Sequence, residues 1–340
     1  MPSNPRIADI CQELNLSKAT VSKALNGYSS VREETRSQVL ACARRLGYAQ
    51  PQGREKNTQL IRVGITASVK VENPNSISPF QVLLTNLIEG LGQYHYDTII
   101  IPPSLFQQQC VPYEQAMRNL NLDCAFLTGL RLDDPYYQQL QSTDFPTVMW
   151  DMTVNNPHVH SVSCGSAEGM RMAVAHLISL GHRRIGLICG HLQAQVSLER
   201  RDGYILALAD AGIPYDPALV YEGDFSETAG AIGFQYLQSK QVTAIACVCD
   251  VTALGVIRAA QAQGLRIPDD LSVTGFDNTN LSEYTNPGLT SVDQHLDQVG
   301  KILVTVIHSI MNHRPVGDSI VHPSFIIRGS TAAPGRSDMP

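Results

Sequence analysis

The sequence predicts an α/β core of two lobes, with parallel sheets flanked by helices, preceded by a small all-α domain. From residue 61 onwards, short apolar runs alternate with amphipathic segments, and such strand–helix alternation is typical of parallel sheets covered by helices on both faces. Before residue 50, apolar residues recur only at helical spacing. The chain has 340 residues, 43% of them hydrophobic, which suffices for about two or three domains with their own cores.

The all-α domain contains three predicted helices. The first carries an apolar stripe and ends near Asn15. Ser17 is suited to cap the second, which begins at about Lys18, because a serine hydroxyl accepts the unpaired amides of a first helical turn. Gly27 provides a C-terminal stop, and a third helix is expected over residues 33–46.

The second helix turns short hydroxyl and amine side chains away from its apolar face. A helix, a turn and a second helix of this kind is how helix-turn-helix modules meet DNA, with the start of the second helix against base edges. The segments Ala-Thr-Val-Ser-Lys-Ala-Leu-Asn (19–26), Glu-Glu-Thr-Arg (33–36) and Leu-Gly-Tyr (46–48) resemble, in order and spacing, the headpiece of LacI/GalR-family transcription regulators. A three-helix bundle with a solvated surface is the alternative.

The resemblance implies a set of DNA-binding residues. Hydroxyls and amides would contact phosphates, whereas Lys18, Ala19 and Lys23 would read bases. The full set is Arg6, Ser17, Lys18, Ala19, Thr20, Ser22, Lys23 and Asn26.

Charge separates the two parts of the chain. Residues 1–60 hold nine Lys or Arg against five acids, and the remainder holds 16 against 26. A basic first sixth on an acidic body is expected when only that module touches phosphate. The expected partner is double-stranded, pseudo-palindromic operator DNA, and its symmetry requires a homodimer.

Seven apolar runs of the core read as buried parallel strands, and amphipathic segments lie between most of them. The predicted strands are Ile61–Thr66, Asp97–Ile101, Cys124–Leu127, Thr147–Trp150, Ile185–Cys189, Thr243–Val248 and Leu271–Phe276. The predicted helices are Phe80–Gln93, Gly169–Leu180, Leu198–Ala211, Glu227–Gln238 and Val251–Gln263. In such sheets, ligands bind at the carboxyl ends of the strands.

Segments of the core resemble the same family: Leu-Gly-His-Arg-Arg-Ile-Gly (180–186), Glu-Arg-Arg-Asp-Gly-Tyr (199–204), Cys-Asp-Val-Thr-Ala-Leu-Gly (249–255), Ile-Pro-Asp-Asp-Leu-Ser-Val-Thr-Gly-Phe-Asp-Asn (267–278) and Pro-Gly-Leu-Thr-Ser-Val (287–292). The resemblance implies a periplasmic-binding-protein-like core whose two lobes enclose an effector, with chain crossings near residues 161, 290 and 321.

These crossings define the expected domains. They are a headpiece at 1–49, an atypical linker at 50–60, an N-terminal lobe at 61–161 plus 291–320, a C-terminal lobe at 162–290 plus 321–330, and a tail at 331–340. The tail lacks heptads, so we do not expect a tetramer formed through it.

Three charged residues match family positions that hold the effector: Arg200, Asp250 and Asp277. A carboxylate accepts two hydroxyl hydrogens and a guanidinium donates in a planar fork, so these groups suit a polyol. Each also has a structural alternative, because an aspartate after a strand often caps the next helix and Arg200 could lie at the surface.

Aromatic residues complete the expected effector site. Phe80 and Phe225 match positions near the cleft, where a ring can stack on sugar C–H groups, and Trp150, the only tryptophan, precedes Asp151 after a strand. Each is equally compatible with a place in the core.

The chain departs from the family pattern at three places. Residues 51–58 contain Gly53 and no Leu or Met, so we predict a weak or absent hinge helix. Met152 stands where sugar-responsive relatives often have Arg and a purine-responsive relative has Trp, so this position supports neither effector class. Cys164-Gly165 replaces an expected Asp-Asn, so one polar pocket contact is expected to be missing.

Several function classes are disfavoured by missing patterns. The sequence has no phosphate loop, metalloprotease helix, nucleophile elbow or Rossmann fingerprint, so we expect no enzyme, cofactor or metal. His182, His191 and His295 lack metal-ligand spacing and are expected at the surface or in turns. The cysteines form no C-x-x-C pair and are read as reduced. Without a signal peptide or membrane span, a cytoplasmic protein is expected.

Together these features predict a DNA-binding transcriptional regulator of the repressor type. Its operator affinity would be controlled by a small-molecule effector, most readily a sugar or sugar derivative. The alternatives are a purine- or nucleoside-responsive regulator of the same fold, and a solute-binding protein with a non-functional headpiece.

Overall fold

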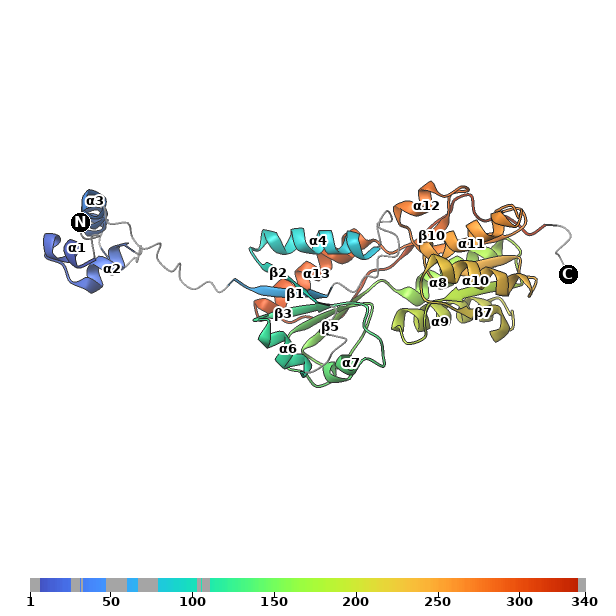
Figure 1. Ribbon diagram of the computed structural model, residues 1–340, viewed down its shortest axis with the longest axis horizontal. Coiled ribbons are helices and arrows are strands. Elements are labelled where there is room, and N and C mark those ends of the chain that lie inside the picture. Colours follow the sequence, from blue (N-terminus) through green and yellow to red (C-terminus); the bar gives the residue numbers. More distant parts are fainter. Residues whose placement is uncertain are drawn as a thin grey trace. The chain divides into compact units, whose positions relative to one another are not determined.

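The computed structural model describes residues 7–25, 31, 33–46, 60–66, 79–102, 105 and 111–335 (Figure 1). The chain forms two compact units, Met1–Gln59 and Leu60–Pro340, each of which is considered by itself. The linker at 51–58 lies outside the described residues, so the hinge prediction stays a prediction.

The first unit is a three-helix domain, as predicted. Its helices are α1 (Ile7–Leu14), α2 (Lys18–Leu25) and α3 (Glu33–Leu46). Burying one apolar stripe from each helix forms a small common core. That core contains the fully buried Ile10, Val21 and Val39, together with Ala24, Cys42 and Ala43.

The first sheet of the core is entirely parallel and has the strand order β11-β5-β4-β3-β1-β2. Helices α4 (Pro79–Gln93) and α13 (Leu296–Met311) cover one face. Helices α6 (Tyr113–Asn119) and α7 (Pro135–Leu140) cover the other (Figure 1). The strands are β1 (Arg62–Thr66), β2 (Asp97–Ile101), β3 (Cys124–Leu127), β4 (Thr147–Trp150), β5 (Val159–Ser163) and β11 (Ser319–Ile320).

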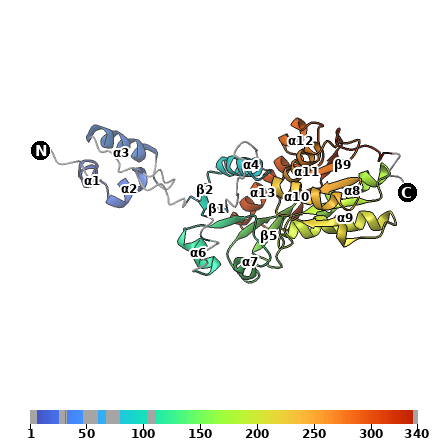
Figure 2. The same ribbon diagram turned by 45° about the vertical axis from the view of Figure 1, so that its right-hand side comes forward.

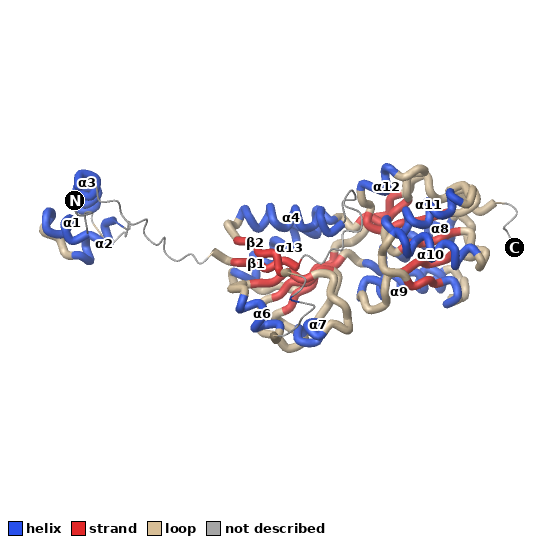
Figure 3. Tube along the Cα trace, viewed as in Figure 1, coloured by secondary structure: helices blue, strands red, loops and turns tan. Residues whose placement is uncertain are grey.

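The second sheet has the order β12-β10-β9-β8-β6-β7. Its strands are β6 (Ile185–Cys189), β7 (Val220–Glu222), β8 (Ala244–Cys247), β9 (Ser272–Asp277), β10 (Thr290–Asp293) and β12 (Ser324–Ile326), of which β12 alone runs antiparallel to its neighbour. Helices enclose it on both sides (Figure 3). They are α8 (Ser166–Ser179) and α9 (Gln195–Asp210) on one face, α10 (Glu227–Gln238) and α11 (Asp250–Ala262) on the other, with the short α12 (Asn280–Tyr284) and the 3-10 turn η1 (Pro217–Leu219).

Helices α8 and α9 lie against each other (Figure 2). Gly203 of α9 permits this approach, because a Cβ atom there would stand 2.2 Å from the carbonyl oxygen of Ala167. The contact fixes the first turns of α9, which carry Arg200, against the lobe.

The predicted two-lobed α/β fold is confirmed, and all seven predicted strands exist within one residue at each end. The strand β5 was not predicted, because its sequence Val-His-Ser-Val-Ser contains only two apolar residues and forms neither an apolar run nor a strict alternation.

One expected lobe boundary needs correction. The boundary at 290/291 cuts through β10, whose Val292 pairs with Phe276 of β9 and Phe325 of β12. Strand β10 therefore belongs wholly to the second sheet, and the chain leaves that sheet only after Asp293. The other two passages between the sheets follow Ser163 and Ile320.

His182 was expected at the surface or in a turn; it lies in the loop between α8 and β6, but it is not at the surface. Its side chain is 1% exposed and hydrogen-bonds to the hydroxyls of Thr243 and Ser272 and to the carbonyl of Ala332. A buried imidazole needs hydrogen-bond partners for both nitrogens, and Ala332 supplies one of them. The start of the expected tail therefore packs against the second sheet. The seven cysteines in the described ranges are free thiols.

Candidate ligand site and nucleic-acid interface

Helix α2 presents a polar, basic face. Ser17 caps it, because its Oγ accepts the Thr20 amide at 3.1 Å and lies 2.8 Å from the Thr20 hydroxyl. Lys18 and Lys23 are exposed, while Val21 is fully buried. The helix therefore turns amines and hydroxyls outward, and these groups can donate to phosphate and base acceptors. Arg6, Asn26 and the Ala19 side chain lie outside the described residues.

In the second unit, Arg200 and Asp277 come together at the carboxyl end of the second sheet. Arg200 Nη1 lies 3.7 Å from Asp277 Oδ1, and both side chains are buried. Nη1 also donates to the Val248 carbonyl at 2.5 Å, and the guanidinium carbon stands 3.7 Å from the centre of the Phe276 ring. The surface alternative for Arg200 is therefore wrong.

Asp277 ends β9 with a φ of 106°, in the left-handed half of backbone space, which turns its carboxyl out of the strand. Gln294 Nε2 donates to its Oδ1. Burial is the main reason that its pKa lies well above the ordinary value; Arg200 opposes this shift, and Asp250 and Asp151 reinforce it.

Asp151 brings a second carboxyl to this place from the first lobe. It follows β4 directly, has a φ of 55°, and its Oδ1 accepts the Cys164 amide at 3.2 Å. Burial raises the pKa of Asp151 to about 6, although the nearby Arg200 charge opposes this. Asp151 was not predicted as a site residue. The sequence feature that could have identified it is its position directly after a buried strand.

Asp250 differs from the effector role expected for it. Its side chain is 1% exposed, and its oxygens accept four hydrogen bonds: from the Thr279 amide at 2.7 Å, the Thr279 hydroxyl at 3.0 Å, Ser282 at 3.1 Å and Ser291 at 2.6 Å. Burial still raises its pKa to about 6. These bonds fasten α12 and β10 to the start of α11, so Asp250 holds the lobe together.

The three aromatic candidates lie in different surroundings. Phe225 has a φ of 69°, and its ring covers Gly190 and meets His191 edge-on at 5.5 Å. Trp150 packs partly against the core between the first sheet and helices α4 and α13. Phe80 lies in the first turn of α4, and its side chain is outside the described part.

Unpaired polar atoms gather near the carboxyl ends of the strands. In the described part of the chain, five buried atoms without a hydrogen-bond partner lie at or just after a strand end or in the first two turns of α9: Trp150 Nε1, His191 Nδ1, Ser197 Oγ, Arg201 Nε and Gln294 Oε1. Ser161 Oγ and Thr274 Oγ1, which also lack partners, lie within β5 and β9. Because buried polar atoms are normally paired, such a concentration is typical of a ligand site. Arg201 lies in the family-like segment 199–204, whereas Ser197 and Gln294 lie outside every segment that resembles the family.

The two lobes also meet directly. The Leu132 amide donates to the Gln193 carbonyl at 2.8 Å, the Thr153 amide donates to Gln195 Oε1 at 3.0 Å, and Gln195 Nε2 donates to the Thr153 hydroxyl at 3.0 Å. The loops after β3 and β4 are thereby joined to the region after β6, beside the Arg200 cluster.

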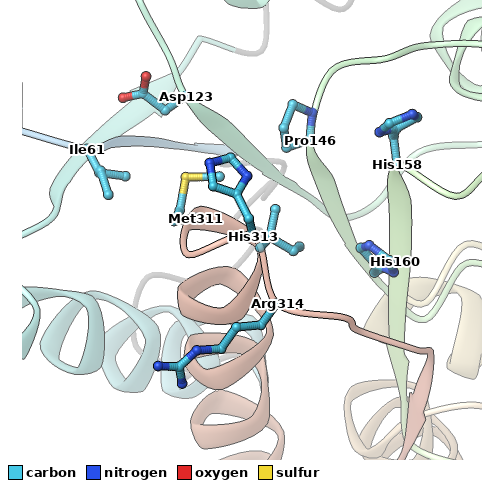
Figure 4. Close-up of a pocket in the computed structure, with 9 residues that line it drawn as sticks. Ile61, Asp123, Pro146, His158, His160, Met311, His313 and Arg314 are labelled. Atoms are coloured by element: carbon cyan, nitrogen blue, oxygen red, sulfur yellow. The ribbon is translucent and has the colours of Figure 1, made fainter.

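A hollow of about 450 Å³ lies elsewhere, at the amino ends of β1, β3, β4 and β5 and the end of α13 (Figure 4). His158, His160 and His313 line it with Asp123 and Met311. It is at the opposite edge of the first sheet from Asp151. No cluster of His, Cys, Asp or Glu suited to a metal ion exists among the described residues, and none of the described helices is long and apolar enough to cross a membrane.

Comparison with known proteins identifies relatives of both units. Residues 6–51 match the model of bacterial regulatory proteins of the lacI family, and residues 174–331 match a periplasmic binding protein-like domain. An HTH-type transcriptional regulator from the aml 5′ region of Streptomyces limosus is 34% identical, over 97% of this chain and 95% of its own length.

Two solved structures show the same fold. The lac repressor dimer bound to operator and the anti-inducer ONPF aligns with a TM-score of 0.74 at 24% identity, covering 97% of this chain and 100% of that one. The transcriptional regulator CelR in complex with cellobiose aligns with a TM-score of 0.71 at 24% identity, covering 96% and 99%.

Proposed function

The chain belongs to the LacI family of bacterial regulatory proteins and is a DNA-binding transcriptional regulator, and on that premise we propose that a sugar or similar polyol, bound between its two core lobes, controls its affinity for an operator. The observation that carries this proposal is the Arg200–Asp277 pair, set among buried polar atoms that lack partners.

The chemistry of the pair supports a hydroxyl-bearing effector. A carboxylate accepts hydroxyl hydrogens and a guanidinium donates to hydroxyl oxygens, so adjacent groups of both kinds suit a vicinal diol. We propose that Arg200, Asp277 and Asp151 contact the effector, with the ring of Phe225 beside it. A role for Trp150 or Phe80 stays a prediction from the sequence. Asp250, whose carboxyl already accepts hydrogen bonds from Thr279, Ser282 and Ser291, is proposed to stabilise the lobe and not to contact the effector.

The proposed domains follow the sheets. The first lobe comprises residues 61–163 and 294–320, and the second comprises residues 164–293 and 321–335. Asp151 comes from the first lobe, whereas Arg200 and Asp277 come from the second. A ligand that touches all three favours one arrangement of the lobes, and by linkage operator affinity changes with the same coupling.

On the DNA side, we propose that α2 enters the major groove with Ser17, Lys18, Thr20, Ser22 and Lys23 facing the duplex. One small basic module offers few phosphate contacts, so tight binding requires two copies on a pseudo-palindromic site. A homodimer is therefore the proposed active form, and the solved lac repressor relative is a dimer on its operator.

Operator recognition is tested by gel shift. The purified chain should bind DNA from upstream of its own gene more tightly than random duplex at moderate salt. Replacing Lys18 by Ala should relax preference at one base position, while Lys301→Ala, an exposed lysine on α13, should change nothing. Equal affinity for both duplexes, with and without metabolites, would contradict the proposal.

Effector control is tested separately with Asp277→Ala. This variant should lose the thermal shift that the parent shows with its ligand, whereas Asp210→Ala, at a surface ion pair, should keep it. A normal ligand response of Asp277→Ala would remove this residue from the site.

A further inference from the structure

The side chains of Gln195 and Thr153 form a clasp between the two core lobes. Gln195 is the first residue of α9 in the second lobe, and Thr153 lies in the loop after β4 of the first lobe. Gln195 Oε1 accepts the Thr153 amide at 3.0 Å, and Gln195 Nε2 donates to the Thr153 hydroxyl at 3.0 Å. Two hydrogen bonds of one amide group therefore cross from lobe to lobe.

Each partner of the clasp is held in place by its own lobe. Gln195 Nε2 also donates to Glu199 Oε1 at 2.8 Å, one turn further along α9, so the amide group uses its acceptor and both donor hydrogens. On the other side, the Tyr137 hydroxyl of α7 donates to the Thr153 carbonyl at 3.3 Å. Because both partners are already oriented, the clasp forms with a small loss of conformational entropy.

The clasp joins the two segments that carry the proposed effector contacts. Thr153 lies two residues after Asp151, and Gln195 lies five residues before Arg200 on the same helix. A bond between Thr153 and Gln195 therefore keeps the loop of Asp151 beside the first turns of α9. It does so with groups that belong to the protein and not to an effector.

We infer that Gln195 is a positioning residue, and that the Gln195–Thr153 clasp sets how much of the chain has its lobes closed before an effector binds. The inference rests on the proposed function, in which the arrangement of the lobes controls operator affinity. By linkage, a contact that favours one arrangement changes operator affinity even though it lies outside the headpiece.

A second contact between the lobes reports closure and is not altered by changing the clasp side chains. The Leu132 amide of the first lobe donates to the Gln193 carbonyl of the second at 2.8 Å, so its hydrogen exchanges with solvent when the lobes separate or its loop frays. The Asp134 amide donates to the Arg131 carbonyl at 3.0 Å within that same loop, so it reports fraying alone. The two amides together distinguish lobe opening from local loosening.

Gln195→Met removes the clasp and keeps the length of the side chain. Hydrogen–deuterium exchange at single amides is measured on the full chain without DNA or added sugar. Leu132 should exchange at least about 3-fold faster than in the parent, as expected for losing hydrogen bonds between neutral groups, while Asp134 should keep its rate. Gln115→Met is the matched control, because Gln115 donates to Asn119 within exposed α6 of one lobe, and it should leave both rates unchanged. An unchanged Leu132 rate, or an equal acceleration at Asp134, overturns the inference.

Thr153→Val tests the clasp from the other lobe and covers the case in which Gln195→Met does not fold. It removes the hydroxyl and keeps the backbone amide, so Leu132 should exchange at least about 2-fold faster, a smaller effect than in Gln195→Met. A parental Leu132 rate in Thr153→Val speaks against a clasp that holds the lobes.

The regulatory part is measured by gel shift of both variants, without added sugar, on DNA from upstream of the gene. Both should change operator affinity in the same direction, by at least about 2-fold, because both favour the same arrangement of the lobes. Changes in opposite directions, or parental affinity in both variants, contradict a role in regulation. Failure of the proposed function gives a different result, since the parent itself would then prefer no DNA while the exchange at Leu132 still responded.

Discussion

Replacing Arg200 by Met should destabilise the core by an amount that depends on pH. The substitution keeps most of the aliphatic stem and removes the charge that faces Asp277 at 3.7 Å. Breaking a buried ion pair by removing one partner costs about 3–5 kcal/mol, because the remaining charge is left uncompensated. The variant also loses the hydrogen bond to the Val248 carbonyl, so we expect a cost of at least about 3 kcal/mol at pH 8.

The cost should shrink in acid. Burial already raises the pKa of Asp277 well above its usual value and that of Asp151 to about 6, and removing Arg200 raises both further. Above pH 4 the folded variant then binds more protons than its unfolded chain, so its stability falls as pH rises. At pH 5 the protonated carboxyls no longer need the guanidinium, and the expected cost is about 1–2 kcal/mol.

The measurement is urea unfolding at pH 5 and pH 8, followed by the fluorescence of Trp150, the only tryptophan. Arg171→Met is the matched control, because Arg171 makes a surface ion pair with Asp210 and both side chains are more than half exposed. That variant should lose no more than about 1 kcal/mol at either pH. The reasoning is refuted if Arg200→Met costs no more than Arg171→Met, or if its cost does not grow between pH 5 and pH 8.

Three further outcomes are expected. Asp151→Asn should flatten the pH dependence of stability, because the folded-state pKa of about 6 makes the parent lose up to about 3 kcal/mol as pH rises from about 4 to 6. Urea unfolding of both proteins across this range measures the effect, and identical profiles would contradict it. Gly203→Ala should cost about 1–3 kcal/mol, since its Cβ would lie 2.2 Å from a carbonyl oxygen of α8, whereas Gly92→Ala, with open space around it, should be neutral or stabilising; equal melting temperatures would show that the helices separate freely. Ser17→Ala should remove the cap on the Thr20 amide, destabilise the headpiece by about 1 kcal/mol and weaken operator binding in a gel shift, and undiminished binding would show that the cap is dispensable.

The site could be predicted only in part. The family resemblance predicted Arg200 and Asp277 as effector contacts, and the structure brings both into one buried pair. The role of Asp250 could not be predicted, because its hydroxyl donors come from Thr279, Ser282 and Ser291, some 29 to 41 residues away.

The sequence alone determined the type of each long element and its place in the chain, because apolar periodicity reports directly on the face that a helix or strand buries. Tertiary structure decided the membership of short strands such as β5 and β10, whose ladders depend on distant partners. It also decided that the Asp250 carboxyl accepts four hydrogen bonds within the protein, whereas that of Asp277 accepts one from the described residues. The number of donors that reach a side chain is set by long-range packing, and no local pattern encodes it.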